Sequence, residues 1–140
     1  MMILFPEIDR KKTKKKVHEL LSTYRSLLRI AGEKNVPKIT ASYVFEVNQN
    51  TNNPIQRAET IIDRKRLAAN ELTKITNAMN QLDRYDRQLL YDKYMDRQFT
   101  TNIALYMTYH MSESKFYREL DKAMIRFAES YESGQLLIEK

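Results

Sequence analysis

The fold is decided by residues 107–131, which read MTYHMSESKFYRELDKAMIRFAESY. The first part is typical of the end of a short helix. A longer helix is predicted after Ser112, because serine caps helix N-termini by accepting a backbone hydrogen bond, and we expect it to end at Gly134. His110 stands at the corner, where positive φ is usual and histidine is among the few tolerated residues besides glycine. The turn residues are therefore His110, Met111 and Ser112.

Apolar residues around this corner have the spacing that two crossing helices need for a shared core. Tyr106 and Met111 lie before and after the corner, and the longer helix carries a continuous apolar stripe. The stripe consists of Phe116, Leu120, Ala123, Phe127 and Tyr131. The opposite face consists of Glu113, Ser114, Lys115, Tyr117, Arg118, Asp121 and Lys122. Two interpretations stay open here: a helix-turn-helix that reads DNA, or two packed helices without such a role.

Two short helices are predicted upstream of the corner. Residues 83–95, DRYDRQLLYDKYM, have the apolar spacing of a short helix. Its inward-facing residues would be Leu89, Leu90 and Tyr94. Residues 100–109, TTNIALYMTY, predict a second short helix that is capped by Thr100 or Thr101.

Two long helices are predicted in the N-terminal half. The first covers residues 10–30, with Asp9 as its N-cap and Gly32 just past its end. Its apolar stripe consists of Val17, Leu20, Leu21, Tyr24 and Leu28. The second begins after an N-cap at Asn53 and runs to about Asn80. Its seven-residue apolar repeat would make a weak coiled-coil seam, so we favour an amphipathic helix packed on the first one.

Between the long helices lies a segment with the alternating pattern of an extended strand. Its apolar residues are Ile39, Ala41, Tyr43, Phe45 and Val47. A lone strand has no sheet to join, so we expect an extended arm that packs on helices or pairs with a second copy of the chain. The chain is thus predicted to be all-α, with about five helices in three parts. Residues 1–53 hold the basic helix, arm and linker; 54–82 form a connecting helix; and 83–140 form a three-helix domain.

The composition limits the class of protein. The chain has 140 residues with two glycines and three prolines, which favours helices. Cysteine is absent, the N-terminus lacks the order of a secretory signal, and no apolar run reaches the roughly 20 residues of a membrane span. We therefore expect a cytoplasmic protein without a membrane partner. The two histidines, His18 and His110, are far apart, and no catalytic or metal-ligand spacing occurs, so we expect no enzyme, no metal and no cofactor.

The positive charge is concentrated in the first half. The net charge is +6, yet residues 83–140 carry nine basic and ten acidic side chains. A lysine run supplies much of the excess, with Lys11, Lys12, Lys14, Lys15 and Lys16. Such a run is usually only a solvated face. Because cations near a helix N-terminus oppose the helix dipole, contact with DNA phosphates is the alternative explanation.

Residues 86–128 resemble region 4 of sigma factors in their RQ-x-L start, their threonine-capped helix and their M-S-E-S turn. The similarity to the ArpU family of phage-type transcriptional regulators covers nearly the whole chain. It is carried by LFPEIDRKKTKKKVHELLSTYRSL, residues 4–27, and by MSESKFYRELDKAMIRFAESYESGQLLIE, residues 111–139. The chain departs from the family at His110, where glycine is usual, and in its asparagine-rich linker.

The resemblance implies a phage or prophage regulator that binds double-stranded DNA and controls late or cell-lysis genes. By the sigma-like pattern, the base-reading residues would be Glu113, Ser114, Tyr117 and Arg118, with Lys115 at the edge. Arg118 could pair with guanine, and Glu113 could accept from cytosine or only favour the helix dipole. Tyr117 could contact a phosphate or a thymine methyl group. Phosphate contacts are expected from the lysine run and from Thr100, Thr101 and Lys122, while Arg126 is expected to be solvated.

Three functions stay open. A sequence-specific regulator is expected to act as a homo-oligomer, with a dimer favoured, because operator symmetry mirrors protein symmetry. A packaging-site recognition protein like a terminase small subunit would bind DNA for another purpose. A sigma-like module that docks on RNA polymerase would touch DNA little, and the near-neutral charge of residues 83–140 favours that alternative.

Overall fold

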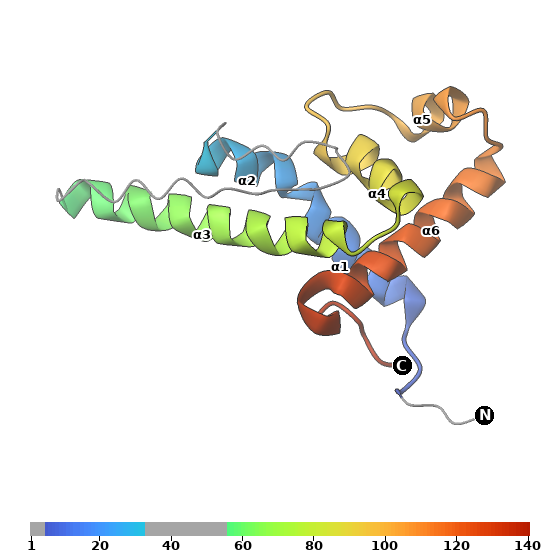
Figure 1. The fold of residues 1–140 in the computed structure, drawn as a ribbon, viewed down its shortest axis with the longest axis horizontal. Coiled ribbons are helices and arrows are strands. Elements are labelled where there is room, and N and C mark those ends of the chain that lie inside the picture. Colours follow the sequence, from blue (N-terminus) through green and yellow to red (C-terminus); the bar gives the residue numbers. More distant parts are fainter. Residues whose placement is uncertain (1–4, 33–55) are drawn as a thin grey trace.

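The computed structural model describes residues 5–32 and 56–140, and these residues form an all-α protein (Figure 1). The all-α prediction with about five helices is confirmed. The α-helices are α1 (Arg10–Ser22), α2 (Tyr24–Ala31), α3 (Gln56–Asn80), α4 (Arg84–Leu90), α5 (Asn102–Thr108) and α6 (Glu113–Ser130). A π-helical turn, η2 (Tyr91–Met95), extends α4, and a 3-10 turn, η3 (Tyr131–Gly134), follows α6. The predicted extended arm and the N-cap at Asn53 lie outside the described residues.

The first predicted helix is divided into two at Thr23. Asp9 caps α1 by accepting from the backbone N–H of Lys12 at 3.0 Å, and Gly32 ends α2 with a φ of 100°, as predicted. The continuous helix, however, is wrong. The Thr23 hydroxyl donates to the carbonyl of Leu20 at 2.6 Å, and such a bond competes with the backbone ladder of a helix. The break lets α1 and α2 pack against different partners.

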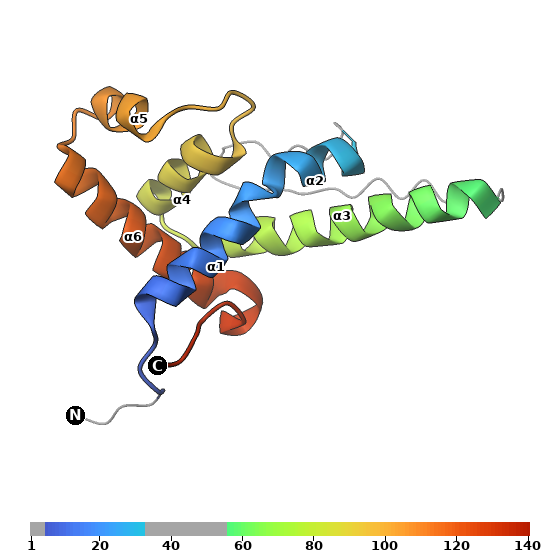
Figure 2. The same cartoon turned by 180° about the vertical axis from the view of Figure 1, so that it is seen from behind.

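The helices are arranged around α3 and α6. The long helix α3 packs along α2, whereas α1 crosses α6, and α4 packs on α6 from another side (Figures 1 and 2). The favoured interpretation of the heptad-like pattern, an amphipathic helix packed on the first predicted helix, is confirmed. Its buried residues include Ala68, Leu72, Ile75 and Met79.

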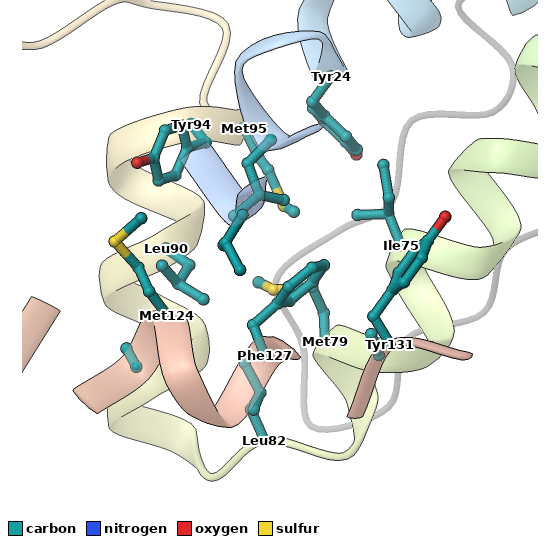
Figure 3. Close-up of a cluster of buried hydrophobic side chains, with 14 of the residues drawn as sticks. Tyr24, Ile75, Met79, Leu82, Leu90, Tyr94, Met95, Met124, Phe127 and Tyr131 are labelled. Atoms are coloured by element: carbon teal, nitrogen blue, oxygen red, sulfur yellow. The ribbon is translucent and has the colours of Figure 1, made fainter. Parts of the chain in front are cut away.

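One hydrophobic core joins the helices. Tyr24 of α2, Met79 of α3, Leu90 of α4 and Phe127 of α6 belong to the same buried cluster (Figure 3). Every residue of the stripe predicted on α6 is buried, as are the inward residues predicted on α4 and η2. Helices from all three predicted parts contribute to this core. The division into three parts itself stays a prediction.

The two ends of the described chain meet (Figure 2). The backbone N–H of Asp9 donates to the carbonyl of Ile138 at 2.6 Å, and the N–H of Ile138 donates to the buried hydroxyl of Thr13 at 3.0 Å. This return of the chain depends on where α6 ends. The helix ends at Ser130 rather than at Gly134, because Tyr131 turns into the core and leaves helical geometry with a ψ of 116°. Gly134, with a φ of 92°, closes the 3-10 turn that follows.

Candidate functional site

The corner between α5 and α6 is a complete Schellman motif. His110 has a φ of 55°, so the predicted left-handed histidine is confirmed. The N–H of Met111 donates to the carbonyl of Tyr106 at 2.9 Å, and the N–H of His110 donates to the carbonyl of Met107 at 3.1 Å. These are the two bonds that define the motif, and they satisfy carbonyls that the end of α5 leaves unpaired. The corner is therefore closed by hydrogen bonds, without glycine.

A small core holds the two helices together across the corner. Phe116 of α6 is fully buried, and the Tyr106 ring lies against it with a centroid distance of 5.8 Å. Leu105 is buried beside them, and Met111 packs on the same cluster. The close-packing positions that the spacing predicted are thus brought together. They determine the angle at which α6 leaves the corner.

The first two turns of α6 present a polar, exposed face. Ser112 caps the helix as predicted, since its hydroxyl oxygen accepts from the N–H of Lys115 at 3.1 Å. The predicted base-reading residues Glu113, Ser114, Lys115, Tyr117 and Arg118 are all exposed. Lys122 is exposed one turn further, 3.9 Å from Glu119. A continuous surface is therefore available for a ligand at this end of α6.

Tyr117 differs from its neighbours because its hydroxyl has a protein partner. Asn102, the first residue of α5, donates from Nδ2 to the Tyr117 hydroxyl oxygen at 3.3 Å. Lys93 of η2 donates from Nζ to Oδ1 of the same Asn102 at 2.6 Å. The sequence did not single out Lys93 or Asn102. No spacing marks them, because the three residues come from three different elements.

The lysine run lies against α6. Lys14 forms an ion pair of 3.1 Å with Asp121, and Asp121 is about one helical turn after Arg118. Thr13 and Val17 face the core, which leaves Lys11, Lys12, Lys15 and Lys16 exposed. This contact brings α1 next to the polar face of α6, although Lys14 and Asp121 are 107 residues apart in sequence. The Asp121 carboxylate partly compensates the charge of Lys14.

The two threonines differ in their roles. Thr101 caps α5, and its hydroxyl oxygen accepts from the N–H of Ala104 at 3.2 Å. This resolves the predicted alternative between Thr100 and Thr101. The Thr100 hydroxyl donates instead to the carbonyl of Gln98 at 3.5 Å. The Thr101 side chain is exposed, and its predicted phosphate contact stays a prediction.

Arg126 is not simply solvated, so that expectation is wrong. Its Nη1 donates to both carboxylate oxygens of Asp86, at 2.8 and 3.1 Å. The Asp86 side chain is buried, whereas that of Arg126 stays about half exposed. The pair joins α4 to α6 behind the polar face. Its role is to stabilise the orientation of α6.

Three further polar side chains, His18, Tyr94 and Tyr109, have protein partners. His18 Nδ1 and the Tyr94 hydroxyl lie 2.8 Å apart in a hydrogen bond. Burial of the Tyr109 hydroxyl raises its pKa most, and its hydrogen bond to Asp92 raises the pKa further.

Within residues 5–32 and 56–140, no group of three or more potential metal ligands comes together. None of the helices in these ranges has the length and apolar character to cross a membrane.

The fold and site define a class of all-α proteins in which a closed corner presents the exposed start of a longer helix. The chain is similar to a protein of Streptococcus phage O1205 that is named as a candidate autolysin regulatory protein, ArpU. The two sequences are 32 % identical, and the alignment covers 99 % of this chain and 100 % of the phage protein. A protein of the same name from Enterococcus hirae is 26 % identical, and that alignment covers 99 % of this chain and 100 % of the Enterococcus protein. The chain belongs to the ArpU family. No general family model and no solved structure matches it.

Proposed function

We propose that this protein is a phage-type regulatory protein that binds double-stranded DNA at specific sequences and controls transcription of late or cell-lysis genes. The observation that carries the proposal is the exposed start of α6, which projects from a corner closed by two hydrogen bonds. In a helix-turn-helix, the start of the second helix enters the major groove and contacts base edges. The relatives' name, autolysin regulatory protein, agrees with a role in controlling lysis genes.

The charge distribution supports a division of work between two helices. Arg118 and Glu113 have the chemistry to recognise guanine and cytosine. Lys14 pairs with Asp121 of α6, so the exposed lysines on the same helix α1 are proposed to supply the sequence-independent attraction to phosphates. The proposed assembly is a homodimer in the cytoplasm of the bacterial host, because two copies would match a two-fold operator. The proposed role is binding, without catalysis or a cofactor.

Selection from random double-stranded DNA with the purified protein tests this function. We expect one enriched motif at moderate salt. The same protein should then bind a fragment from upstream of phage late genes that contains this motif. Absence of any enrichment would contradict sequence-specific regulation.

Replacing Arg118 by alanine should weaken binding to the selected site by about 1–3 kcal/mol and relax the preference at one base pair, as expected for a bidentate contact. Competition binding on the selected site and its single-base variants measures both effects. Arg29→Ala is the matched control, since Arg29 is exposed on α2 and its Nη2 donates to the Ser26 hydroxyl of the same helix. Equal losses on every sequence would assign Arg118 to a phosphate instead.

Neutralising Lys11, Lys12 and Lys15 with glutamine should lower the salt dependence of binding by up to about three units of slope, without changing the motif. The reason is that each phosphate contact releases condensed counterions. Affinity over a salt series provides the measurement. Lys14→Gln is the internal comparison and should have a smaller effect, because Asp121 already pairs with Lys14. An unchanged slope would mean that the lysines are only solvated.

A second candidate function is docking on RNA polymerase. The outer face of α5 favours it, because Ile103 and Met107 are both exposed and lie one turn apart. In that case, the DNA selection would yield no motif, and purified RNA polymerase would bind the chain. Ile103→Ser with Met107→Ser would then abolish the complex.

A further inference from the structure

We propose that Lys93, Asn102 and Tyr117 form a phosphate-binding site that contacts one DNA phosphate beside the exposed face of α6. This inference rests on the proposed function and adds a residue cluster to it. Of the two roles that the sequence left open for Tyr117, a phosphate contact or a thymine methyl contact, it assigns the phosphate contact. The three residues come from η2, α5 and α6, so the site exists only in the folded protein.

The hydrogen bonds leave donors free for an anion. Asn102 uses its amide oxygen to accept from Lys93 at 2.6 Å and its amide nitrogen to donate to Tyr117 at 3.3 Å. Since the Tyr117 hydroxyl oxygen accepts this bond, the hydroxyl hydrogen can donate elsewhere. The Lys93 ammonium group has two further N–H donors. Asn102 thus holds the Lys93 ammonium group and the Tyr117 hydroxyl close together, so both can donate to the oxygens of one phosphate group.

The charge of Lys93 is not compensated within the part of the chain that the structure describes. Its Nζ contacts the neutral amide of Asn102 and lies 5.2 Å from the centroid of the Tyr94 ring, and no carboxylate pairs with it. Lys93 is half-buried, and desolvation lowers its pKa. A desolvated cation without a counter-charge is stabilised by an arriving anion. A phosphate group would supply that charge.

The position of the cluster is suited to a DNA-backbone contact. Tyr117 is next to Arg118 in sequence and one turn beyond Glu113. The cluster lies where α5 meets the start of α6, whereas α1 crosses α6 farther along (Figure 1). Backbone contacts determine the register of a reading helix on the duplex. Contacts at Lys93 and at the α1 lysines would hold α6 from two sides.

Lys93→Gln and Tyr117→Phe test the site on the selected DNA sequence. Lys93→Gln should lower affinity roughly eight-fold at 0.1 M salt and reduce the salt slope by about one unit, as expected for one phosphate contact. Tyr117→Phe should weaken binding equally on the preferred site and on its single-base variants. Lys74→Gln is the matched control, because it removes the same charge from α3, where Glu71 and Glu132 lie near it. It should leave the slope unchanged.

Duplexes with single uncharged methylphosphonate linkages identify the phosphate. Several positions should weaken the wild-type protein, and Lys93→Gln should be insensitive at one of them. Tyr117→Phe removes a single oxygen atom and serves for the same comparison if Lys93→Gln does not fold. Specific binding with an unchanged slope and no such insensitivity would overturn this site but leave the proposed function standing. A protein that binds no DNA would overturn both.

Discussion

Phe127→Ala should lower the free energy of unfolding by about 3–5 kcal/mol, the usual cost of removing a buried phenylalanine side chain and leaving a cavity. Phe127 is 0 % exposed and lies in the centre of the core, with Met79 and Tyr131 close to it (Figure 3). Its ring stacks on that of Tyr131 at a centroid distance of 5.9 Å. Because α6 carries both Phe127 and the exposed polar face, the lower stability of Phe127→Ala should also weaken DNA binding at elevated temperature.

Urea denaturation followed by circular dichroism measures this effect. Tyr85→Ala is the matched control, since Tyr85 is 86 % exposed on α4 and loses a similar ring. Substitutions at such exposed positions are usually within about 0.5 kcal/mol of the wild type. A loss of less than about 1 kcal/mol for Phe127→Ala would contradict the placement of this residue at the centre of the core.

Arg126→Met should destabilise the protein by about 2–3 kcal/mol, because it leaves the buried carboxylate of Asp86 without its partner. The Asp86 side chain is 6 % exposed and that of Arg126 is 48 % exposed. This asymmetry makes a second result expected. Asp86→Asn should cost clearly less, since the half-exposed guanidinium can return to water.

The double variant Asp86→Leu with Arg126→Met completes the measurement. The double variant should recover most of the stability that Arg126→Met loses, because a buried ion pair can often be replaced by apolar residues at little cost in free energy of unfolding. Arg84→Met, at an exposed position on α4, controls for the loss of an arginine. Asp86→Leu is also measured alone, and additive effects of Asp86→Leu and Arg126→Met would show that Asp86 and Arg126 do not interact.

Much of the local structure was predictable from the sequence. The caps at Asp9 and Ser112 and the left-handed turn at His110 were predicted, and Thr101 was one of two candidates for the cap of α5. These features depend on hydrogen bonds between residues three to five positions apart, so a short stretch contains all of the groups involved. The same is true of the apolar stripes, whose period is that of the helix. The resemblance to the ArpU family added the exposed face of α6 as the candidate site.

The errors have a common origin. Thr23 breaks the first helix and Tyr131 ends the last one, although the local spacing favours continuation at both places. In each case a side chain forms a hydrogen bond that the helical spacing does not show. Thr23 bonds to the Leu20 carbonyl, and the Tyr131 hydroxyl bonds to Glu71 across the core. At Tyr131, packing between distant segments overrides the local pattern, whereas at Thr23 a side-chain bond to a residue three positions earlier interrupts it.

The sequence by itself determined the all-α class, the helix ends at most caps, and the residues that face the core, because these follow from short-range hydrogen bonds and helical periodicity. Only the tertiary structure decided which charges meet. Lys14 forms an ion pair with Asp121, and Arg126 forms one with Asp86. Asn102 connects Lys93 to Tyr117 by two hydrogen bonds. These contacts join residues that are far apart in the chain, and their geometry exists only after the core has packed α1, α4, α5 and α6 together.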